Sequence, residues 1–140
     1  MIKLQAFCLK RGGIMKVLIA DDQAEVCSAL KVLFQHLEGN YDIDEANELE
    51  SMLYKVQYNQ PDMLLLDWEL SNMSMGDLIP RLRKLASRMF IIAMSGRPEA
   101  LKEATDAGVN IFVSKGENPG RLLDVINDIR MAVKKEKNIK

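Results

Sequence analysis

The stretch Met63-Leu64-Leu65-Leu66-Asp67 decides the fold: four consecutive apolar residues end at an aspartate. An unbroken apolar run is typical of a central strand in a parallel sheet, because helices cover such a strand on both faces. A second run of this kind, Phe90-Ile91-Ile92-Ala93-Met94, comes later in the chain. Together the two runs predict the buried centre of an open parallel sheet.

Outward from these two runs, short apolar stretches alternate with amphipathic ones five times from Met15 onward. The expected strands are residues 17–20, 43–46, 63–66, 90–94 and 111–113. After each strand, apolar residues recur at spacings of three and four, which predicts a helix. This order predicts one α/β domain: a doubly wound, flavodoxin-like (βα)5 fold with an open sheet of five parallel strands.

The apolar positions also predict which helix faces are buried. The expected faces are Val26, Leu30, Leu33 and Leu37 in the first helix, Leu49, Met52, Leu53 and Val56 in the second, Leu78, Leu82 and Leu85 in the third, Leu101, Ala104 and Ala107 in the fourth, and Leu122, Ile126, Ile129 and Val133 in the last. Gly39 is expected to stop the first helix, and the fourth should run from near Pro98 to Gly108. Asn118 can cap the last helix, with Pro119 in its first position.

The composition is that of a single globular domain, with 48% hydrophobic and 28% charged residues in a chain of 140. Residues 1–14 carry three basic side chains and no acid, and residues 134–140 carry four lysines and one glutamate. That leaves 12 basic and 19 acidic side chains in residues 15–133. An acidic body argues against nucleic-acid binding, which favours a basic stripe, and is compatible with cation binding.

The two cysteines, Cys8 and Cys27, have no metal-ligand spacing, which is typical of a reduced, cytoplasmic protein. No apolar run approaches the roughly 18 residues that cross a bilayer, and the N-terminus lacks the pattern of a signal peptide. We therefore expect a cytoplasmic protein without a membrane partner.

Polar residues follow four of the five expected strands. They are Asp21 and Asp22 after the first strand, Asp67 after the third, Ser95 after the fourth, and Ser114 and Lys115 after the fifth. In an open parallel sheet the functional site lies outside the carboxyl ends of the strands. We therefore expect three carboxylates, a hydroxyl and an ammonium to converge at one edge of the sheet.

Three clustered carboxylates repel one another, and a cation among them offsets that cost. Oxygen ligands without histidine or cysteine favour a hard ion such as Mg²⁺. An aspartate nucleophile beside a magnesium ion, a lysine and a hydroxyl matches the needs of phosphoryl transfer. The plainer interpretation, that Asp21 and Asp22 only cap the first helix, stays open at this point.

Taken together, these residues resemble the receiver domain of bacterial two-component response regulators, over residues 15–133. The resemblance implies that Asp67 accepts the phosphoryl group, and that Ser95 and Lys115 contact it. It also implies a Mg²⁺ site formed by Asp21, Asp22, Asp67 and the backbone carbonyl of Glu69. Phe112 occupies the place of an aromatic residue that moves with the hydroxyl residue, although it could equally be ordinary packing.

Two departures from the family pattern stand close to these residues. Ser71 replaces a proline that usually follows the acceptor, and one extra residue precedes Gly76. Gly116 replaces the proline that usually follows the lysine, which excludes a cis proline there and leaves the aim of Lys115 to be tested.

Glu69 and Arg97 lie two residues after the acceptor and two after the hydroxyl residue. In the family, side chains at these positions flank the phosphoryl group. Our hypothesis is that they form an ion pair across the site entrance and slow self-dephosphorylation. The alternative is two independent exposed charges of almost no mutual effect.

The resemblance implies a stand-alone, chemotaxis-receiver-like regulator, and not an enzyme with turnover beyond its own phosphorylation and dephosphorylation. Its implied partners are a sensor histidine kinase or a phosphotransfer protein and an unidentified output protein that reads the surface near the fourth helix and fifth strand. Homodimer formation on phosphorylation is a further expectation. Two alternatives remain. One is a haloacid-dehalogenase-like phosphatase, although in that family the acidic pair follows the lysine and an aspartate stands in the place of Glu69. The other is a pseudo-receiver that binds a partner without phosphorylation.

The two ends of the chain are set apart from residues 15–133. Met15-Lys16-Val17 is similar to the usual start of the family, so residues 1–14 are expected to be an N-terminal extension. It is either non-native upstream sequence or a true segment that adds an edge strand or packs on a partner. Residues 134–140 are expected to be a basic, solvated C-terminal tail.

Overall fold

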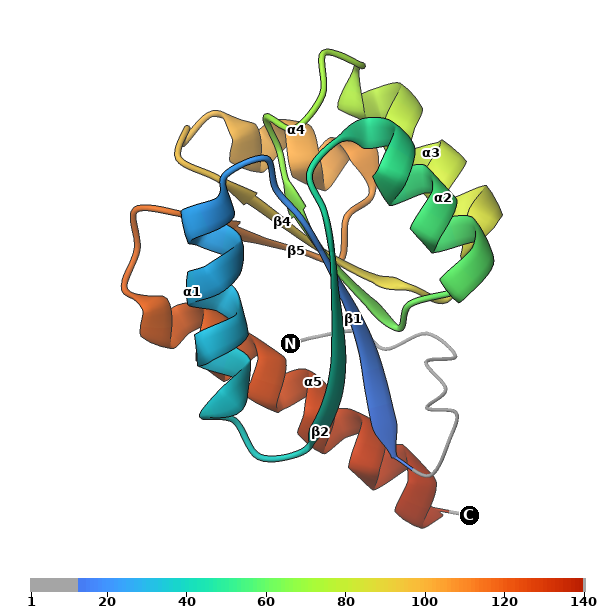
Figure 1. Cartoon of the computed structure of the whole chain (residues 1–140), viewed down its shortest axis with the longest axis vertical. Helices are drawn as coiled ribbons and strands as arrows, with labels where there is room; N and C mark the ends of the chain where they lie inside the picture. Colours follow the sequence, from blue (N-terminus) through green and yellow to red (C-terminus); the bar gives the residue numbers. More distant parts are fainter. Residues whose placement is uncertain (1–12, 140) are drawn as a thin grey trace.

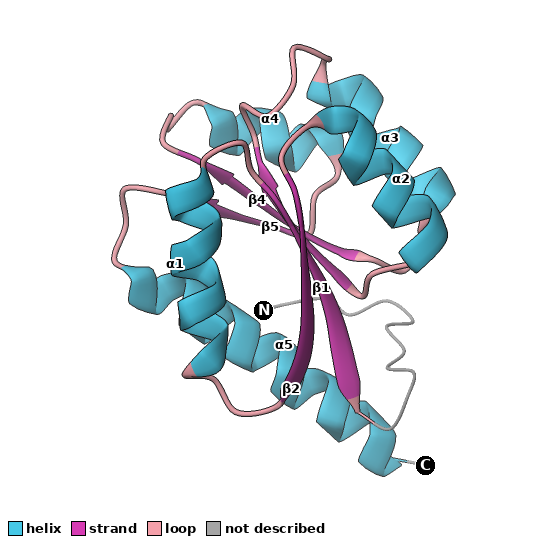
Figure 2. Cartoon of the chain, viewed as in Figure 1, coloured by secondary structure: helices cyan, strands magenta, loops and turns pink. Residues whose placement is uncertain are grey.

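The computed structural model describes residues 13–139, with side chains through residue 132. Five parallel strands form one sheet in the order β2-β1-β3-β4-β5. Figures 1 and 2 show this twisted sheet between the surrounding helices. In chain order the elements are β1 (Ile14–Ala20), α1 (Ala24–Gln35), β2 (Asn40–Ala46), α2 (Leu49–Asn59), β3 (Met63–Asp67), α3 (Met75–Leu85), β4 (Phe90–Ser95), α4 (Ala100–Ala107), β5 (Ile111–Ser114) and α5 (Pro119–Ile139). The predicted doubly wound, flavodoxin-like fold is confirmed.

Helices cover both faces of the sheet, with α1 and α5 on one face and α2, α3 and α4 on the other (Figure 1). Because side chains alternate along a strand, the run in β3 divides between the two layers. Met63 and Leu65 belong to the core beneath α1 and α5, whereas Leu64 and Leu66 belong to the core beneath α2 to α4. Every residue of β3 is buried, as the unbroken apolar run predicts.

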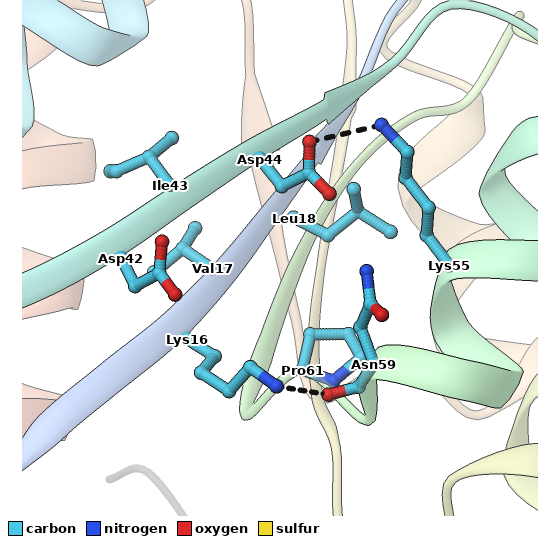
Figure 3. Close-up of a pocket in the computed structure, with 9 residues that line it drawn as sticks. All are labelled: Lys16, Val17, Leu18, Asp42, Ile43, Asp44, Lys55, Asn59 and Pro61. Carbon is cyan, nitrogen blue, oxygen red and sulfur yellow. Dashed lines mark hydrogen bonds and ion pairs between the residues drawn. The ribbon is translucent and has the colours of Figure 1, made fainter.

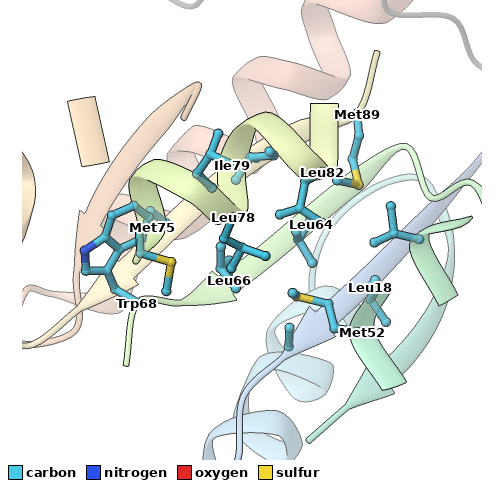
Figure 4. Close-up of a cluster of buried hydrophobic side chains, with 14 of the residues drawn as sticks. Leu18, Met52, Leu64, Leu66, Trp68, Met75, Leu78, Ile79, Leu82 and Met89 are labelled. Carbon is cyan, nitrogen blue, oxygen red and sulfur yellow. The ribbon is translucent and has the colours of Figure 1, made fainter. Parts of the chain in front are cut away.

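The core on the α2–α4 face ends beside the carboxyl end of β3. Leu78 and Leu82 of α3 are fully buried over Leu64 and Leu66 (Figure 4). Complete burial of a leucine side chain is worth about 1.5–3 kcal/mol relative to exposure. Trp68, directly after β3, extends this core toward the sheet edge.

The buried face of α1 differs from the predicted one. Its buried residues are Cys27, Leu30 and Phe34, whereas Val26 and Leu33 are only partly buried. The buried face is therefore rotated by about one residue from the predicted one. The difference arises because the free Cys27 packs as a small hydrophobic residue, which the apolar pattern did not include. Leu37 lies beyond the end of the helix, and Gly39, at φ +116°, turns the chain into β2.

The predicted face of α4 was also wrong in one position. Leu101 is 53% exposed, whereas Ala100 and Ala104 are fully buried. These two alanines lie one helical turn apart and face the core, so Leu101 is directed to solvent. The helix begins at Ala100 because hydrogen bonds within residues 97–101 form a separate turn after Pro98, and it ends at Gly108 as predicted.

The predicted start of the last helix is confirmed. Pro119 is the first residue of α5, and the Oδ1 atom of Asn118 accepts a hydrogen bond of 2.9 Å from the backbone N–H of Gly120. Leu122, Ile126 and Ile129 are buried as predicted, and the side chain of Val133 lies outside the described part. The backbone of the expected basic tail is helical through Ile139.

The N-terminal prediction is only partly addressed. Residues 1–12 lie outside the described residues, and β1 already begins at Ile14, which pairs with Asn40 of β2. Within the described part of the chain, no helix has the length and apolar character that crossing a membrane requires.

Candidate functional site

The residues that follow the strands lie together at one edge of the sheet. β3 pairs with β1 on one side and with β4 on the other, and β4 pairs with β5. Backbone hydrogen bonds continue past the strand ends, from Trp68 N–H to Met94 O (2.8 Å) and from Lys115 N–H to Ser95 O (2.9 Å). The chain segments that carry the site are therefore held by the sheet itself.

Asp21, Asp22 and Asp67 form the acidic cluster predicted from the strand ends. One oxygen from each carboxylate lies within 4.8 Å of the other two. Asp21 and Asp67 are buried, and Asp22 is exposed to solvent. The carboxylate of Asp21 accepts a hydrogen bond from the N–H of Gln23, while Gln23, the residue before α1, makes no side-chain capping bond. The two aspartates therefore face the cluster and do not form a helix cap of the usual kind.

Lys115 joins two members of this cluster. Its Nζ atom lies 3.0 Å from Oδ2 of Asp21 and 3.1 Å from Oδ1 of Asp67. The lysine side chain is 24% exposed, so these ion pairs are shielded from water on most sides. Lys115 thus points into the acidic cluster and reaches both carboxylates, although glycine follows it in place of the usual proline.

The electrostatics of the cluster show an excess of negative charge. Burial raises the pKa of the Asp67 carboxyl above its ordinary value, and the charge of Asp21 adds to this, against the lowering effect of the Glu69 N–H and of Lys115. Burial acts to lower the pKa of Lys115, but its bonds to Asp21 and Asp67 outweigh burial and raise it. A single ammonium therefore does not offset the buried carboxylates.

This donor set fits a hard divalent cation. Three carboxylates close enough to share one ion, with no histidine or cysteine among them, are the ligands that Mg²⁺ prefers. A cation would also supply the positive charge that the cluster lacks. The carboxylate of Asp67 accepts the N–H of Glu69 at 3.2 Å, so the chain turns tightly after Asp67 and keeps the Glu69 backbone near the cluster.

Ser95 is fully buried, and its hydroxyl is directed to Glu69. The Oγ atom donates to the Glu69 carboxylate, with oxygens at 2.9 and 3.0 Å, and accepts the N–H of Arg97 at 3.0 Å. This contact was not predicted. The carboxylate of Glu69 thus accepts the hydroxyl that, according to the resemblance, contacts the phosphoryl group.

Arg97 lies among three carboxylates. Its guanidinium is 3.6 Å from Glu69, 3.5 Å from Glu99 and 3.6 Å from Glu103. The predicted ion pair between Glu69 and Arg97 is therefore present, at partly exposed side chains. Its effect on dephosphorylation stays a prediction.

Glu103 is a site neighbour that was not predicted, and it reaches the site through Trp68, which directly follows the acceptor in the sequence. The indole Nε1–H of Trp68 donates to Oε2 of Glu103 at 3.0 Å, which links the residue after Asp67 to helix α4. The two residues are 35 positions apart, and only the packing of α4 against the sheet edge brings them together. Phe112 of β5 packs at the border of the same core and is half-buried, and a switching role for it stays a prediction.

Two hollows in the described surface have charged residues in their walls. One, of about 470 Å³, is lined by the loop after β3, from Trp68 onward, and by Arg97 and Glu103. The other, of about 480 Å³, lies between β1, β2 and α2 (Figure 3). Its lysines are already engaged, Lys55 with Asp44 at 2.9 Å and Lys16 with the carbonyl of Asn59. The charged chemistry therefore concentrates at the strand ends.

Comparisons with known proteins identify the family to which the chain is similar. Residues 17–127 match the family model described as response regulator receiver domain. The chain is 28% identical over 124 residues to the sensory transduction protein LytR of Staphylococcus epidermidis, which covers 89% of this chain and 49% of that protein. The chain thus spans about half the length of the curated relatives it matches.

Solved structures share the fold. A CheY-like response regulator receiver domain protein from Methanospirillum hungatei superposes with a TM-score of 0.73 at 24% identity, over 88% of this chain and 98% of that one. The chemotaxis protein CheY4 of Vibrio cholerae gives 0.69 at 21% identity, over 82% and 98%. At these identities the likeness establishes the architecture.

Proposed function

This chain belongs to the response regulator receiver domain family, and we propose that Asp67 is its phosphoacceptor. Receiver domains of this family take a phosphoryl group from histidine kinases and act on output partners. The observation that carries the assignment is the convergence of three carboxylates and one ammonium around Asp67, with Ser95 nearby.

The proposed metal ligands are Asp21, Asp22 and Asp67 with the backbone carbonyl of Glu69. A bound Mg²⁺ supplies positive charge that neutralises the oxygens of the transferring phosphoryl group. Asp22 is the exposed member of the set, so it gives the cation an approach from solvent. The buried pair, Asp21 and Asp67, gains most from a cation because burial penalises their charge most strongly.

The remaining residues act on the phosphoryl group itself. The Asp67 carboxylate oxygen attacks phosphorus as the bond to the partner's imidazole nitrogen breaks. Lys115 already contacts Asp67 and remains beside the new group as a counter-charge. Once the Ser95 hydroxyl is released from Glu69, it donates a hydrogen bond to a phosphoryl oxygen. The aspartyl phosphate adds about −1.5 to −2 charges, to which Ser95 and Lys115 respond locally.

The proposed output is a change of surface near α4 and β5. Ser95 ends β4, and Phe112 lies on β5, beside α4. A partner that binds this surface would distinguish the phosphorylated from the unphosphorylated state by a two-state shift. The donor is proposed to be a sensor histidine kinase or a phosphotransfer protein; homodimer formation on phosphorylation, the cytoplasmic location and the absence of nucleic-acid binding stay proposals.

Incubation with acetyl phosphate and Mg²⁺, followed by intact-protein mass spectrometry, tests the assignment. The wild type is expected to gain one phosphoryl group, and Asp67→Ala is expected to gain none. Labelling that survives in Asp67→Ala contradicts the acceptor. Sustained turnover of a small phosphate ester favours the phosphatase alternative, and no labelling under conditions that label other receivers favours the pseudo-receiver; nothing in the comparisons favours either.

A further inference from the structure

We propose that Glu103 of α4 is a positioning residue that holds Glu69 on the Ser95 hydroxyl and thereby couples α4 to the phosphoacceptor loop. The inference rests on the proposed function of Asp67 as acceptor. It concerns four consecutive contacts that run from Trp68 through Glu103, Arg97 and Glu69 to Ser95.

The first contact ties α4 to the residue after the acceptor. Trp68 is 3% exposed, and its ring packs beside Met75 in the α2–α4 core (Figure 4). The indole N–H is the polar atom of this buried ring, and a buried donor needs an acceptor. Glu103 supplies that acceptor at 3.0 Å. Loss of the carboxylate therefore leaves a buried N–H without this partner.

The next contacts carry the restraint to the hydroxyl. The Nη2 atom of Arg97 lies 3.6 Å from a carboxylate oxygen of Glu103 and 3.6 Å from one of Glu69. One guanidinium nitrogen thus bridges the two carboxylates. Glu69 in turn accepts the Ser95 hydroxyl. Trp68 therefore orients Glu103, and Glu103 orients the guanidinium of Arg97. That guanidinium in turn keeps the carboxylate of Glu69 on the hydroxyl of Ser95.

The restraint opposes phosphorylation because Ser95 has one hydroxyl proton. The hydroxyl donates its hydrogen bond to Glu69, and a phosphoryl oxygen on Asp67 would need the same hydrogen bond. New negative charge on Asp67 repels the Glu69 carboxylate and attracts Arg97. The repulsion acts against the contact between Glu69 and Ser95, and the attraction acts against the contact between Arg97 and Glu103, so the added charge weakens the connection between α4 and the loop. Individual contacts between partly exposed charges are weak, so the expected bias is a few-fold change in population.

The chain offers a matched control in Glu99. It also pairs with Arg97, at 3.5 Å, but it has no contact with Trp68. Glu99→Gln therefore removes one charge beside Arg97 but keeps the hydrogen bond between Trp68 and Glu103 that connects the loop to α4. Glu103→Gln keeps an acceptor for the indole while it removes the charge, and Glu103→Ala removes both.

The test measures the rate of labelling by acetyl phosphate with Mg²⁺. Glu103→Ala is expected to label about two- to fivefold faster than the wild type, Glu103→Gln to fall between them, and Glu99→Gln to match the wild type. In a Ser95→Ala background Glu103→Ala is expected to lose its accelerating effect, because no hydroxyl remains to be released. An equal effect of Glu103→Ala with and without Ser95 overturns the proposal, since a general loosening of α4 does not depend on Ser95.

Amide hydrogen exchange without phosphodonor separates this proposal from the proposed function. Glu103→Ala is expected to raise exchange in residues 95–107 above that of Glu99→Gln. If no variant is labelled, the acceptor assignment fails, and the exchange comparison alone decides on the positioning role. Equal exchange in Glu103→Ala and Glu99→Gln overturns that role.

Discussion

The ammonium of Lys115 lies 3.1 Å from Oδ1 of Asp67, across 48 positions of the chain. The same nitrogen contacts Asp21 at 3.0 Å, so one cation serves two buried carboxylates. This arrangement is costly to assemble, since each charge loses most of its hydration. It is also sensitive, because any change of charge at Asp67 alters the balance of the whole cluster.

Replacement of Lys115 by methionine is expected to destabilise the fold by about 1–3 kcal/mol. The change removes the ammonium and leaves Asp21 and Asp67 as buried, uncompensated carboxylates, while the apolar stem is kept. Urea unfolding at neutral pH in EDTA measures the difference. Lys102→Met is the control, because Lys102 is 85% exposed and pairs with Asp106 on the surface of α4. Equal effects of the two substitutions would contradict a special role for Lys115.

Asp67→Asn is expected to stabilise the protein at neutral pH in EDTA. Burial raises the pKa of Asp67 above its ordinary 3.8, so the folded chain holds this proton more tightly than the unfolded chain. Stability therefore falls as the pH rises from about 3.8 through the raised pKa, and the cost is fully present above it. Asparagine does not carry this cost.

Urea unfolding of both proteins at several pH values checks the sign. The advantage of Asp67→Asn is expected at neutral pH and should shrink toward about pH 3, where the carboxyl is largely protonated in both states. A constant difference at every pH would indicate that the gain has another origin than the charge of Asp67.

Mg²⁺ is expected to raise the melting temperature of the wild type. A ligand that binds only the folded state stabilises it by about 2.7 kcal/mol at a hundredfold excess over Kd. Asp21→Asn removes one of the three clustered carboxylates and should abolish most of this effect. Asp106→Asn, on the exposed surface of α4, should keep it. The same shift in both variants would show that the ion acts on the general surface charge.

The strand-end residues were predictable because their signal is local. The apolar runs that end at Asp67 and Ser95 fix which strands are central, and parallel pairing then brings their carboxyl ends together. Asp21 and Lys115 follow from the same rule. No knowledge of helix packing was needed to place these four side chains at one edge.

The contacts of Glu103 were not predictable in this way. Its carboxylate reaches Trp68 and Arg97 only because Ala100 and Ala104 are buried and direct another face of α4 toward the loop. The sequence pattern favoured Leu101 as a core residue, so the helix was predicted in a different rotation. Side-chain partners on a short helix depend on that rotation, and small buried alanines indicate it weakly.

Cys27 is expected to resist alkylation in the folded protein. Burial, reinforced by the carboxylate of Glu45, raises the pKa of its thiol from 9.0 to about 11, so little thiolate is present at neutral pH. In a Cys8→Ser variant, where Cys27 is the single thiol, iodoacetamide should react about a hundredfold more slowly than in urea-unfolded chain. Reaction at the unfolded rate would mean that α1 opens readily.

Arg97→Ala is expected to shorten the lifetime of the aspartyl phosphate by about two- to fivefold. Arg97 holds the carboxylate of Glu69 at the entrance of the site, with 3.6 Å between their charged atoms. Together the two side chains restrict the approach of water to phosphorus, and the guanidinium also offsets the charge of the phosphoryl group. Without Arg97, Glu69 loses its counter-charge and is repelled from the entrance.

Removal of free phosphodonor from labelled protein, followed by mass spectrometry over time, gives the lifetime. Arg121→Ala is the control, because Arg121 of α5 forms a comparable exposed ion pair, at 3.2 Å, with Glu117 in the loop before that helix. An unchanged lifetime in Arg97→Ala would identify Glu69 and Arg97 as independent surface charges. A lifetime shortened equally by Glu69→Gln and Arg97→Ala, with no further loss in the double variant, would show that the pair acts as one unit, since substitutions of two partners in a single contact do not add.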